Sequence, residues 1–131
     1  MLDTQTHDNL LAALQGEAFA YARYSLFAAA ARERGAVRLA SLFDGLAAVE
    51  LDEHFAELAD LAGLVGSDAD NLRVALEDEN TEAAATYPRY AAEARARGDA
   101  AAAERFAELA EDELGHAKTL EGALERLEVP A

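Results

Sequence analysis

Residues 106–127 read FAELAEDELGHAKTLEGALERL, and this stretch decides the fold because apolar residues recur in it every three or four positions. One helix face collects Phe106, Leu109, Glu113, His116, Leu120, Leu124 and Leu127. A glutamate and a histidine therefore stand in the middle of a stripe that is otherwise apolar. An amphipathic helix turns such a stripe toward the protein core, so the segment predicts a long helix with an ionisable pair on its buried face.

Three further segments have the same periodicity, and the strict alternation typical of strands is absent. The four helices are expected over about Thr6–Arg34, Val37–Val65, Asp70–Arg97 and Asp99–Leu127. Gly35, Gly66 and Gly98 are the natural helix stops, and Ser67 or Asp68 can cap the third helix. Four long helices joined by short loops predict an all-α fold, an antiparallel four-helix bundle.

The second half of the chain repeats the first. Arg34, Gly35, Phe43 and Glu50 recur at one constant interval as Arg97, Gly98, Phe106 and Glu113, whereas Glu17 and His54 recur one position sooner, as Glu79 and His116. We therefore expect two pseudo-symmetric helical hairpins that form a single domain over residues 1–131. Pro88 lies inside the third helix and should kink it or mark an offset there.

The composition excludes several classes of function. The 131 residues contain no cysteine, which excludes disulfides, thiolate nucleophiles and metal sites built on sulfur. With 11 Lys and Arg against 26 Asp and Glu, the net charge of −15 disfavours nucleic acid and anionic membranes as partners. The polar N-terminus does not resemble a signal peptide, and no apolar run reaches the roughly 20 residues that span a bilayer. We therefore expect a cytoplasmic protein.

Each predicted helix places a glutamate near the middle of its apolar face. These acids are Glu17, Glu50, Glu79 together with Glu82, and Glu113. Burying several unpaired carboxylates together is very costly, and no lysine or arginine lies on the same stripes at that level. Two divalent metal ions would balance the charge, with His54 and His116 as nitrogen ligands. Two glutamates plus two Glu-x-x-His motifs is the ligand set of carboxylate-bridged dimetal sites in helix bundles.

The second helix departs from the Glu-x-x-His motif, because Glu50 and His54 are four residues apart and Glu53 occupies the third position. Two interpretations remain: Glu53 replaces or joins the histidine as a ligand, or one extra residue is inserted before His54. The stripe in register with His54 continues through Leu58 and Leu61, whereas the stripe in register with Glu53 is acidic. The apolar stripe favours His54, with the extra residue absorbed by a π-bulge.

Three groups of residues give the chain a family resemblance. They are Gln15-Gly16-Glu17 with Ala22-Arg23-Tyr24, then Glu79-Asn80-Thr81-Glu82 with Tyr87-Pro88, and finally Phe106 with Glu113-Leu114-Gly115-His116. In these motifs the chain resembles the rubrerythrin-type diiron proteins of the ferritin-like superfamily, over nearly its whole length.

The resemblance implies a ferritin-like bundle that binds two iron ions per chain, with a mixed iron and manganese site also open. It implies bridging roles for Glu50 and Glu113, terminal roles for Glu17 and Glu79, histidine ligands His54 and His116, an extra carboxylate Glu82, and tyrosines Tyr24 and Tyr87 that hydrogen-bond to ligand carboxylates. Glu82, Tyr24 and Tyr87 would be the residues that assist the reaction.

The resemblance further implies an oxidoreductase that reduces hydrogen peroxide to water. The alternatives are a ferroxidase or an oxidase that uses O2 in iron handling, and a bundle that binds divalent metals without catalysis. The sequence ends at Ala131 without the four-cysteine rubredoxin domain of many relatives, so an external donor such as a rubredoxin or a reductase is expected. Alanine-rich stretches at residues 28–31 and 100–103 permit close helix approach, and a homodimer is expected.

Overall fold

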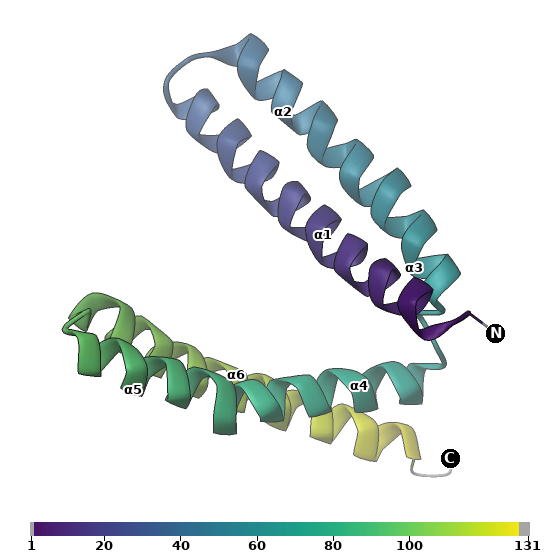
Figure 1. The fold of residues 1–131 in the computed structure, drawn as a ribbon, viewed down its shortest axis with the longest axis vertical. Helices are drawn as coiled ribbons and strands as arrows, with labels where there is room; N and C mark the ends of the chain where they lie inside the picture. The colour runs from purple at the N-terminus through teal and green to yellow at the C-terminus, as the bar shows by residue number, and fades with distance from the viewer. Residues whose placement is uncertain (1, 129–131) are drawn as a thin grey trace. The chain divides into compact units, whose positions relative to one another are not determined.

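The computed structural model describes residues 2–128, which are helical except for short connections, as the sequence predicts. The chain divides into two compact units, residues 1–65 and residues 66–131, and each is a helical hairpin (Figure 1). We name them hairpin 1 and hairpin 2. The expected all-α class and the two hairpins are confirmed.

Hairpin 1 pairs one long helix with a second that is interrupted by a π-helix. Helix α1 (Thr4–Glu33) lies beside α2 (Val37–Val49), η1 (Glu50–Phe55) and α3 (Ala56–Ala62), which follow one another without a break (Figure 1). The side chains buried in this hairpin are mostly small: Leu14, Ala28, Ala31, Ala40, Ala47 and Ala59. Small side chains let the two helix backbones approach closely, so the hairpin holds together with little apolar bulk.

Hairpin 2 has the same plan, with the π-helix in its first half. Helices α4 (Asp68–Thr81), η2 (Glu82–Thr86) and α5 (Tyr87–Arg97) follow one another and pack on α6 (Ala100–Glu128) (Figure 1). Its buried apolar residues are Ala91, Ala94, Ala103 and Ala117. The two hairpins are thus alike in core composition as well as in sequence.

The helix boundaries lie within about two residues of the sequence expectations, except at the end of the second helix. Gly98 ends the third helix as predicted, with a left-handed φ of 84°. The second helix ends at Ala62 instead of Val65, because Gly63 adopts a φ of 63° and the amide of Leu64 then donates to the carbonyl of Ala59. A glycine in the left-handed conformation ends a helix, because the amides that follow can then donate to the last free carbonyls of the helix. Gly63 therefore ends the second helix three residues before the expected Gly66.

The helix starts are fixed by side-chain caps. Asp3 accepts a hydrogen bond from the amide of Thr6 at the start of α1. Ser67 accepts one from the amide of Asp70 at the start of α4, which confirms Ser67 as a cap of the third helix. That helix begins at Asp68, two residues earlier than expected.

Both long interrupted helices contain a π-helix near their middle. The π-helix η1 lies where the sequence predicts an extra residue, between Glu50 and His54. The second, η2, ends immediately before Tyr87 and Pro88, where the amide of Tyr87 donates to the carbonyl of Glu82, five residues earlier. Proline has no amide donor, so the offset expected at Pro88 takes the form of a widened turn just ahead of it.

Within residues 2–128, no helix combines the length and the apolar character needed to cross a membrane.

Candidate metal centre

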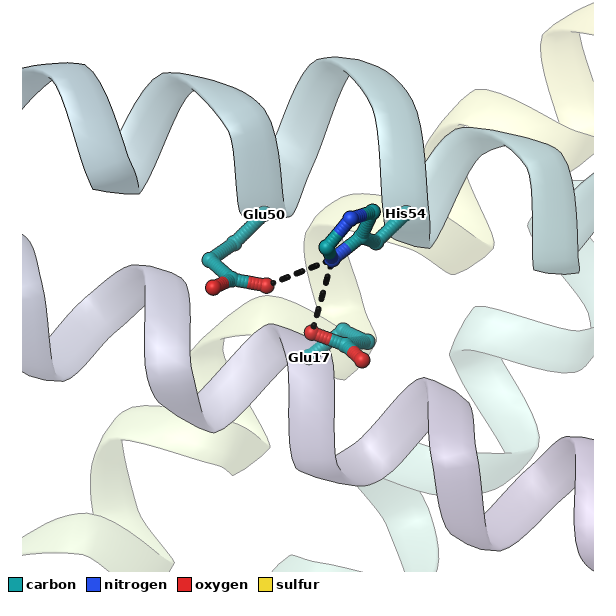
Figure 2. Close-up of side chains that lie close together, drawn as sticks. All are labelled: Glu17, Glu50 and His54. Carbon is teal, nitrogen blue, oxygen red and sulfur yellow. Dashed lines mark hydrogen bonds and ion pairs between the residues drawn. The ribbon is translucent and has the colours of Figure 1, made fainter.

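Hairpin 1 brings together three of the predicted metal ligands. Glu17 extends from α1, and Glu50 and His54 extend from η1, so that the three side chains point toward one another between the helices (Figure 2). The Nδ1 atom of His54 lies 3.0 Å from Oε2 of Glu50 and 3.6 Å from Oε2 of Glu17. One donor atom from each residue lies within 4.8 Å of the others, which is close enough for one ion to contact all three.

Hairpin 2 contains the equivalent group. Glu79 extends from α4, and Glu113 and His116 extend from α6. The Nδ1 atom of His116 lies 2.7 Å from Oε2 of Glu113 and 3.6 Å from Oε2 of Glu79. We name the two groups triad 1 and triad 2; each offers two carboxylates and one imidazole.

The acids of triad 1 share their protons unequally. The pKa of Glu17 is raised, because it hydrogen-bonds to Glu50, is partly desolvated and feels the negative charge of Glu50. The pKa of Glu50 is lowered, chiefly by the hydrogen bond from Glu17 and further by His54. The pKa of His54 is raised, chiefly by its hydrogen bond to Glu50. The hydrogen bond between Glu17 and Glu50 is therefore the largest cause of the pKa shift of both acids.

Triad 2 repeats this pattern. The pKa of Glu79 is raised, first by its hydrogen bond to Glu113 and then by burial, and the pKa of Glu113 is lowered by the same bond. The pKa of His116 is raised, chiefly by its hydrogen bond to Glu113. The same pattern of pKa shifts is thus found in both hairpins, each on its own pair of helices.

The donor set and its burial fit a divalent metal. Glu113 is buried, with 9% of its surface exposed. Oε2 of Glu79 is buried and, within residues 2–128, has no partner at hydrogen-bond distance, since Nδ1 of His116 is 3.6 Å away. A buried carboxylate oxygen without a partner is costly, and a bound cation would satisfy it. Carboxylate oxygens with one imidazole nitrogen suit iron, manganese and zinc, so the residues of both triads fit the metal that the sequence predicts.

The structure places the two candidate ligands that follow Glu50 differently. His54 belongs to triad 1, whereas Glu53 is exposed and lies outside it. The π-helix gives the physical reason, because its wider turn brings a residue four positions after Glu50 to the same face. Glu82 is half-buried at the start of η2 and also lies outside both groups, so its role as an extra carboxylate stays a prediction.

The two predicted tyrosines occupy equivalent places beside aromatic partners. Tyr24 stacks on Phe43 with ring centroids 6.0 Å apart, and Tyr87 stacks on Phe106 at 6.3 Å. The pKa of Tyr87 is raised, first by burial and then by the negative charge of Glu82. Within residues 2–128, neither hydroxyl hydrogen-bonds to a ligand carboxylate, so that part of their role stays a prediction.

A sequence model of the family described as rubrerythrin matches residues 8–124. The chain belongs to the rubrerythrin family. The rubrerythrin of Porphyromonas gingivalis is 35% identical over 126 residues, which cover 86% of this chain and 62% of that protein. The nigerythrin of Nitratidesulfovibrio vulgaris is 52% identical over 46 residues, which cover 35% of this chain and 23% of that protein. The chain thus spans less than two thirds of the length of these curated rubrerythrin-like relatives.

Membership in the rubrerythrin family confirms the sequence-based assignment to ferritin-like diiron proteins. The match includes both triads, since it runs from before Glu17 to beyond His116. The 131 residues contain no cysteine and therefore no rubredoxin-type iron site of four thiolates.

The sequence interpretation missed the π-helix η2, although the repeat contains a signal for it. Glu17 recurs as Glu79 one position sooner than Tyr24 recurs as Tyr87, so hairpin 2 has one extra residue between these positions. The π-helix lies in that interval. The reasoning that predicts η1 from the Glu50 spacing therefore predicts η2 as well.

Proposed function

We propose that this rubrerythrin-family chain forms a single ferritin-like domain in which triad 1 and triad 2 together bind two iron ions, and that it reduces hydrogen peroxide to water. The observation that carries the proposal is the equivalence of the triads: each supplies two glutamates and one histidine with donor atoms within 4.8 Å of one another. Six ligands in two matching sets is what a carboxylate-bridged pair of ions requires.

The residues take the roles that the family pattern implies. By the family pattern, Glu50 and Glu113 would be shared between the two ions, and Glu17 and Glu79 would be terminal ligands. His54 and His116 would each supply a nitrogen ligand. Glu82, at the start of η2, lies three residues after Glu79 and adds a further carboxylate.

When bound, two ferrous ions supply the two electrons that cleave the O–O bond of peroxide. The overall reaction also consumes two protons and yields two water molecules. Burial and the charge of Glu82 raise the pKa of Tyr87, so its hydroxyl keeps its proton at neutral pH and can hydrogen-bond to a carboxylate or to the peroxide. Tyr24 has the equivalent place in hairpin 1. An external donor, such as a rubredoxin or a reductase, returns the two electrons.

The decisive experiment compares two oxidants on the anaerobically reduced protein. The chain is loaded with ferrous iron, the bound iron is counted, and the near-ultraviolet absorption of ferric iron is followed after one equivalent of peroxide or of O2. We expect about two irons per chain and much faster oxidation by peroxide. Equal rates would instead favour an O2-dependent oxidase or ferroxidase, and a redox-inert ion would favour a non-catalytic metal bundle.

A matched pair of variants tests the ligand assignment. His54→Ala should lower the bound iron and the rate of peroxide reduction, whereas Glu53→Gln should leave both unchanged, because Glu53 is exposed and lies outside triad 1. The opposite result would make Glu53 the ligand. Circular dichroism of both variants controls for loss of helix.

A further inference from the structure

Hairpin 2 contains three aromatic rings in mutual contact. Tyr87 stacks on Phe106 with ring centroids 6.3 Å apart, and the Tyr90 centroid lies 5.5 Å from that of Phe106. The centroids of the two tyrosine rings are 6.3 Å apart. Rings whose centroids are about 4.5–7 Å apart touch one another. The three residues, which we name the ring cluster of hairpin 2, therefore form one continuous aromatic group.

The ring cluster of hairpin 2 begins close to the proposed metal ligands. Phe106 is seven residues before Glu113 on α6, so the two side chains share a helix face and lie about 10 Å apart along the axis. The pKa of Tyr87 is raised first by burial and then by nearby carboxylates, among them both acids of triad 2. Tyr90 follows Tyr87 by about one turn of α5. Tyr87 is thus the tyrosine near the ligands, and Tyr90 is the tyrosine farther along.

The surroundings of Tyr90 favour loss of its phenolic proton on oxidation. Tyr90 is half-buried and lines a hollow of about 350 Å³ with Phe106, Glu93 and Arg97. Charged side chains in the wall let water enter, and water can accept the proton. The guanidinium of Arg89 lies 4.7 Å from the centroid of the Tyr90 ring. A second positive charge on the ring is unfavourable beside this cation, so the oxidised side chain is the neutral phenoxyl radical.

Hairpin 1 has the same arrangement of rings with one hydroxyl fewer. Its three residues, at one constant repeat interval from Tyr87, Tyr90 and Phe106, are Tyr24, Phe27 and Phe43. Their ring contacts are equally close, with centroids 6.0 Å apart for Tyr24 and Phe43 and 5.3 Å apart for Phe27 and Phe43. Phenylalanine therefore meets the packing requirement at this position. The hydroxyl of Tyr90 adds a proton-coupled redox group that Phe27 lacks.

We propose that Tyr90 is a redox-active residue that supplies one electron, through Phe106 and Tyr87, when peroxide reacts at a metal centre that has already lost one of its two electrons. The centre gives its remaining electron and Tyr90 gives the second. One peroxide molecule, one proton, one electron and one phenol thus yield two water molecules and one neutral phenoxyl radical. The phenolic proton leaves through the hollow, and an external one-electron reductant with a proton restores Tyr90.

This role protects the ligands, because the O–O bond is cleaved with its full two electrons even when the centre is half-oxidised. The inference rests on the proposed function, since bound iron and peroxide together accept the electron. The contacts within the ring cluster of hairpin 2 do not depend on iron, so they can be tested with and without it.

The first test uses electron paramagnetic resonance of the iron-loaded chain. The reduced protein is oxidised by one electron, mixed with one equivalent of peroxide and frozen. We expect a tyrosyl radical in the wild type and loss of most of this signal in Tyr90→Phe. Tyr21→Phe is the matched control, because Tyr21 is 38% exposed and belongs to neither group of rings, and it should keep the signal. A wild type that consumes peroxide without a radical, or an undiminished radical in Tyr90→Phe, would overturn the proposal.

The second test replaces iron with a photo-oxidant. The chain has no cysteine, so His116→Cys carries a single ruthenium bipyridine label at a proposed ligand position whose native side chain is 62% exposed. A light flash with a sacrificial electron acceptor should oxidise Tyr90 in the metal-free chain, measured as transient absorption of the phenoxyl radical. Adding Tyr90→Phe should lower the radical yield several-fold, and equal yields would contradict the electron path. Loss of iron binding with an intact photo-induced radical is a failure of the proposed function, whereas the reverse is a failure of this inference.

Discussion

The two hairpins reach the same ligand geometry by different backbone paths. In hairpin 1 the π-helix Glu50–Phe55 includes both Glu50 and His54, so the two proposed ligands on this helix are four residues apart. In hairpin 2 the corresponding proposed ligands, Glu113 and His116, lie on regular α-helix three residues apart. The Nδ1 atom of each histidine nevertheless lies 3.6 Å from the glutamate of the first helix of its own hairpin. The relative positions of the proposed ligands are therefore more alike in the two hairpins than the types of helix that carry them.

The largest expected effect comes from removing the less exposed glutamate of either triad, Glu50 or Glu113. Removing a residue that only orients a metal ligand lowers metal affinity by up to roughly 100-fold. If the triads are equivalent, Glu50→Ala and Glu113→Ala should each lower iron affinity by more than this. Equilibrium titration with ferrous iron under anaerobic conditions measures this. Asp112→Asn is the control, since Asp112 is an exposed neighbour of Glu113. A large loss of iron affinity in one variant and none in the other would show that the two triads are not equivalent.

A single deletion can make hairpin 1 resemble hairpin 2. Deleting the exposed Asp52 restores a three-residue interval between the glutamate and the histidine, so η1 should become regular α-helix and iron binding should persist. Recovery of a regular backbone hydrogen bond should raise the free energy of unfolding by about 1 kcal/mol. Thermal unfolding of the metal-free chain measures the gain.

The matched deletion removes Ala48 from the regular helix α2. This deletion rotates the part of α2 that precedes residue 48 by about 100° about the helix axis relative to Glu50, so iron binding should be lost. If both deletions abolished binding, the π-helix would do more than absorb an extra residue.

The smallest expected effect concerns the helix caps with which both hairpins begin. Ser67→Ala removes the cap of α4 and should cost about 1 kcal/mol of stability at neutral pH. The hydroxyl of Ser67 also donates to Asp70 at 2.6 Å and lowers the pKa of that carboxyl. A lowered pKa stabilises the fold above the unfolded value, and this contribution is lost as the pH falls through the folded value.

The difference between wild type and Ser67→Ala should therefore shrink in acid, as measured by urea unfolding across the acidic pH range. It should not vanish, because the hydroxyl still accepts from the amide of Asp70. Hairpin 1 offers the control, since its cap Asp3 remains intact in this variant. A difference that grew in acid would contradict the assignment.

The sequence predicts the fold class and the triads because both depend on helical periodicity. Spacing alone places Glu17 beside Glu50 and His54, since each lies mid-way along a stripe that must face the neighbouring helix. The same reasoning finds η1, because a shift of the apolar stripe marks an extra residue. These predictions succeed where one physical requirement, burial of one helix face, determines the answer.

Other features depend on choices that periodicity does not rank. Gly63 and Gly66 are both able to stop the second helix, and the hydrogen bond from Leu64 to Ala59 decides for the earlier one. The π-helix η2 widens the helix just before Pro88. The sequence repeat reveals it only when the interval from Glu79 to Tyr87 is compared with the interval from Glu17 to Tyr24.

The paired triads also bear on how such a chain can arise. A hairpin that supplies two glutamates and a histidine needs only a copy of itself to provide six ligands, so either half of this chain encodes half of the complete set. Duplication and fusion of one hairpin gene would yield the observed repeat directly. After fusion each half can change independently, and Glu82 and Arg89 are places where the two copies have diverged.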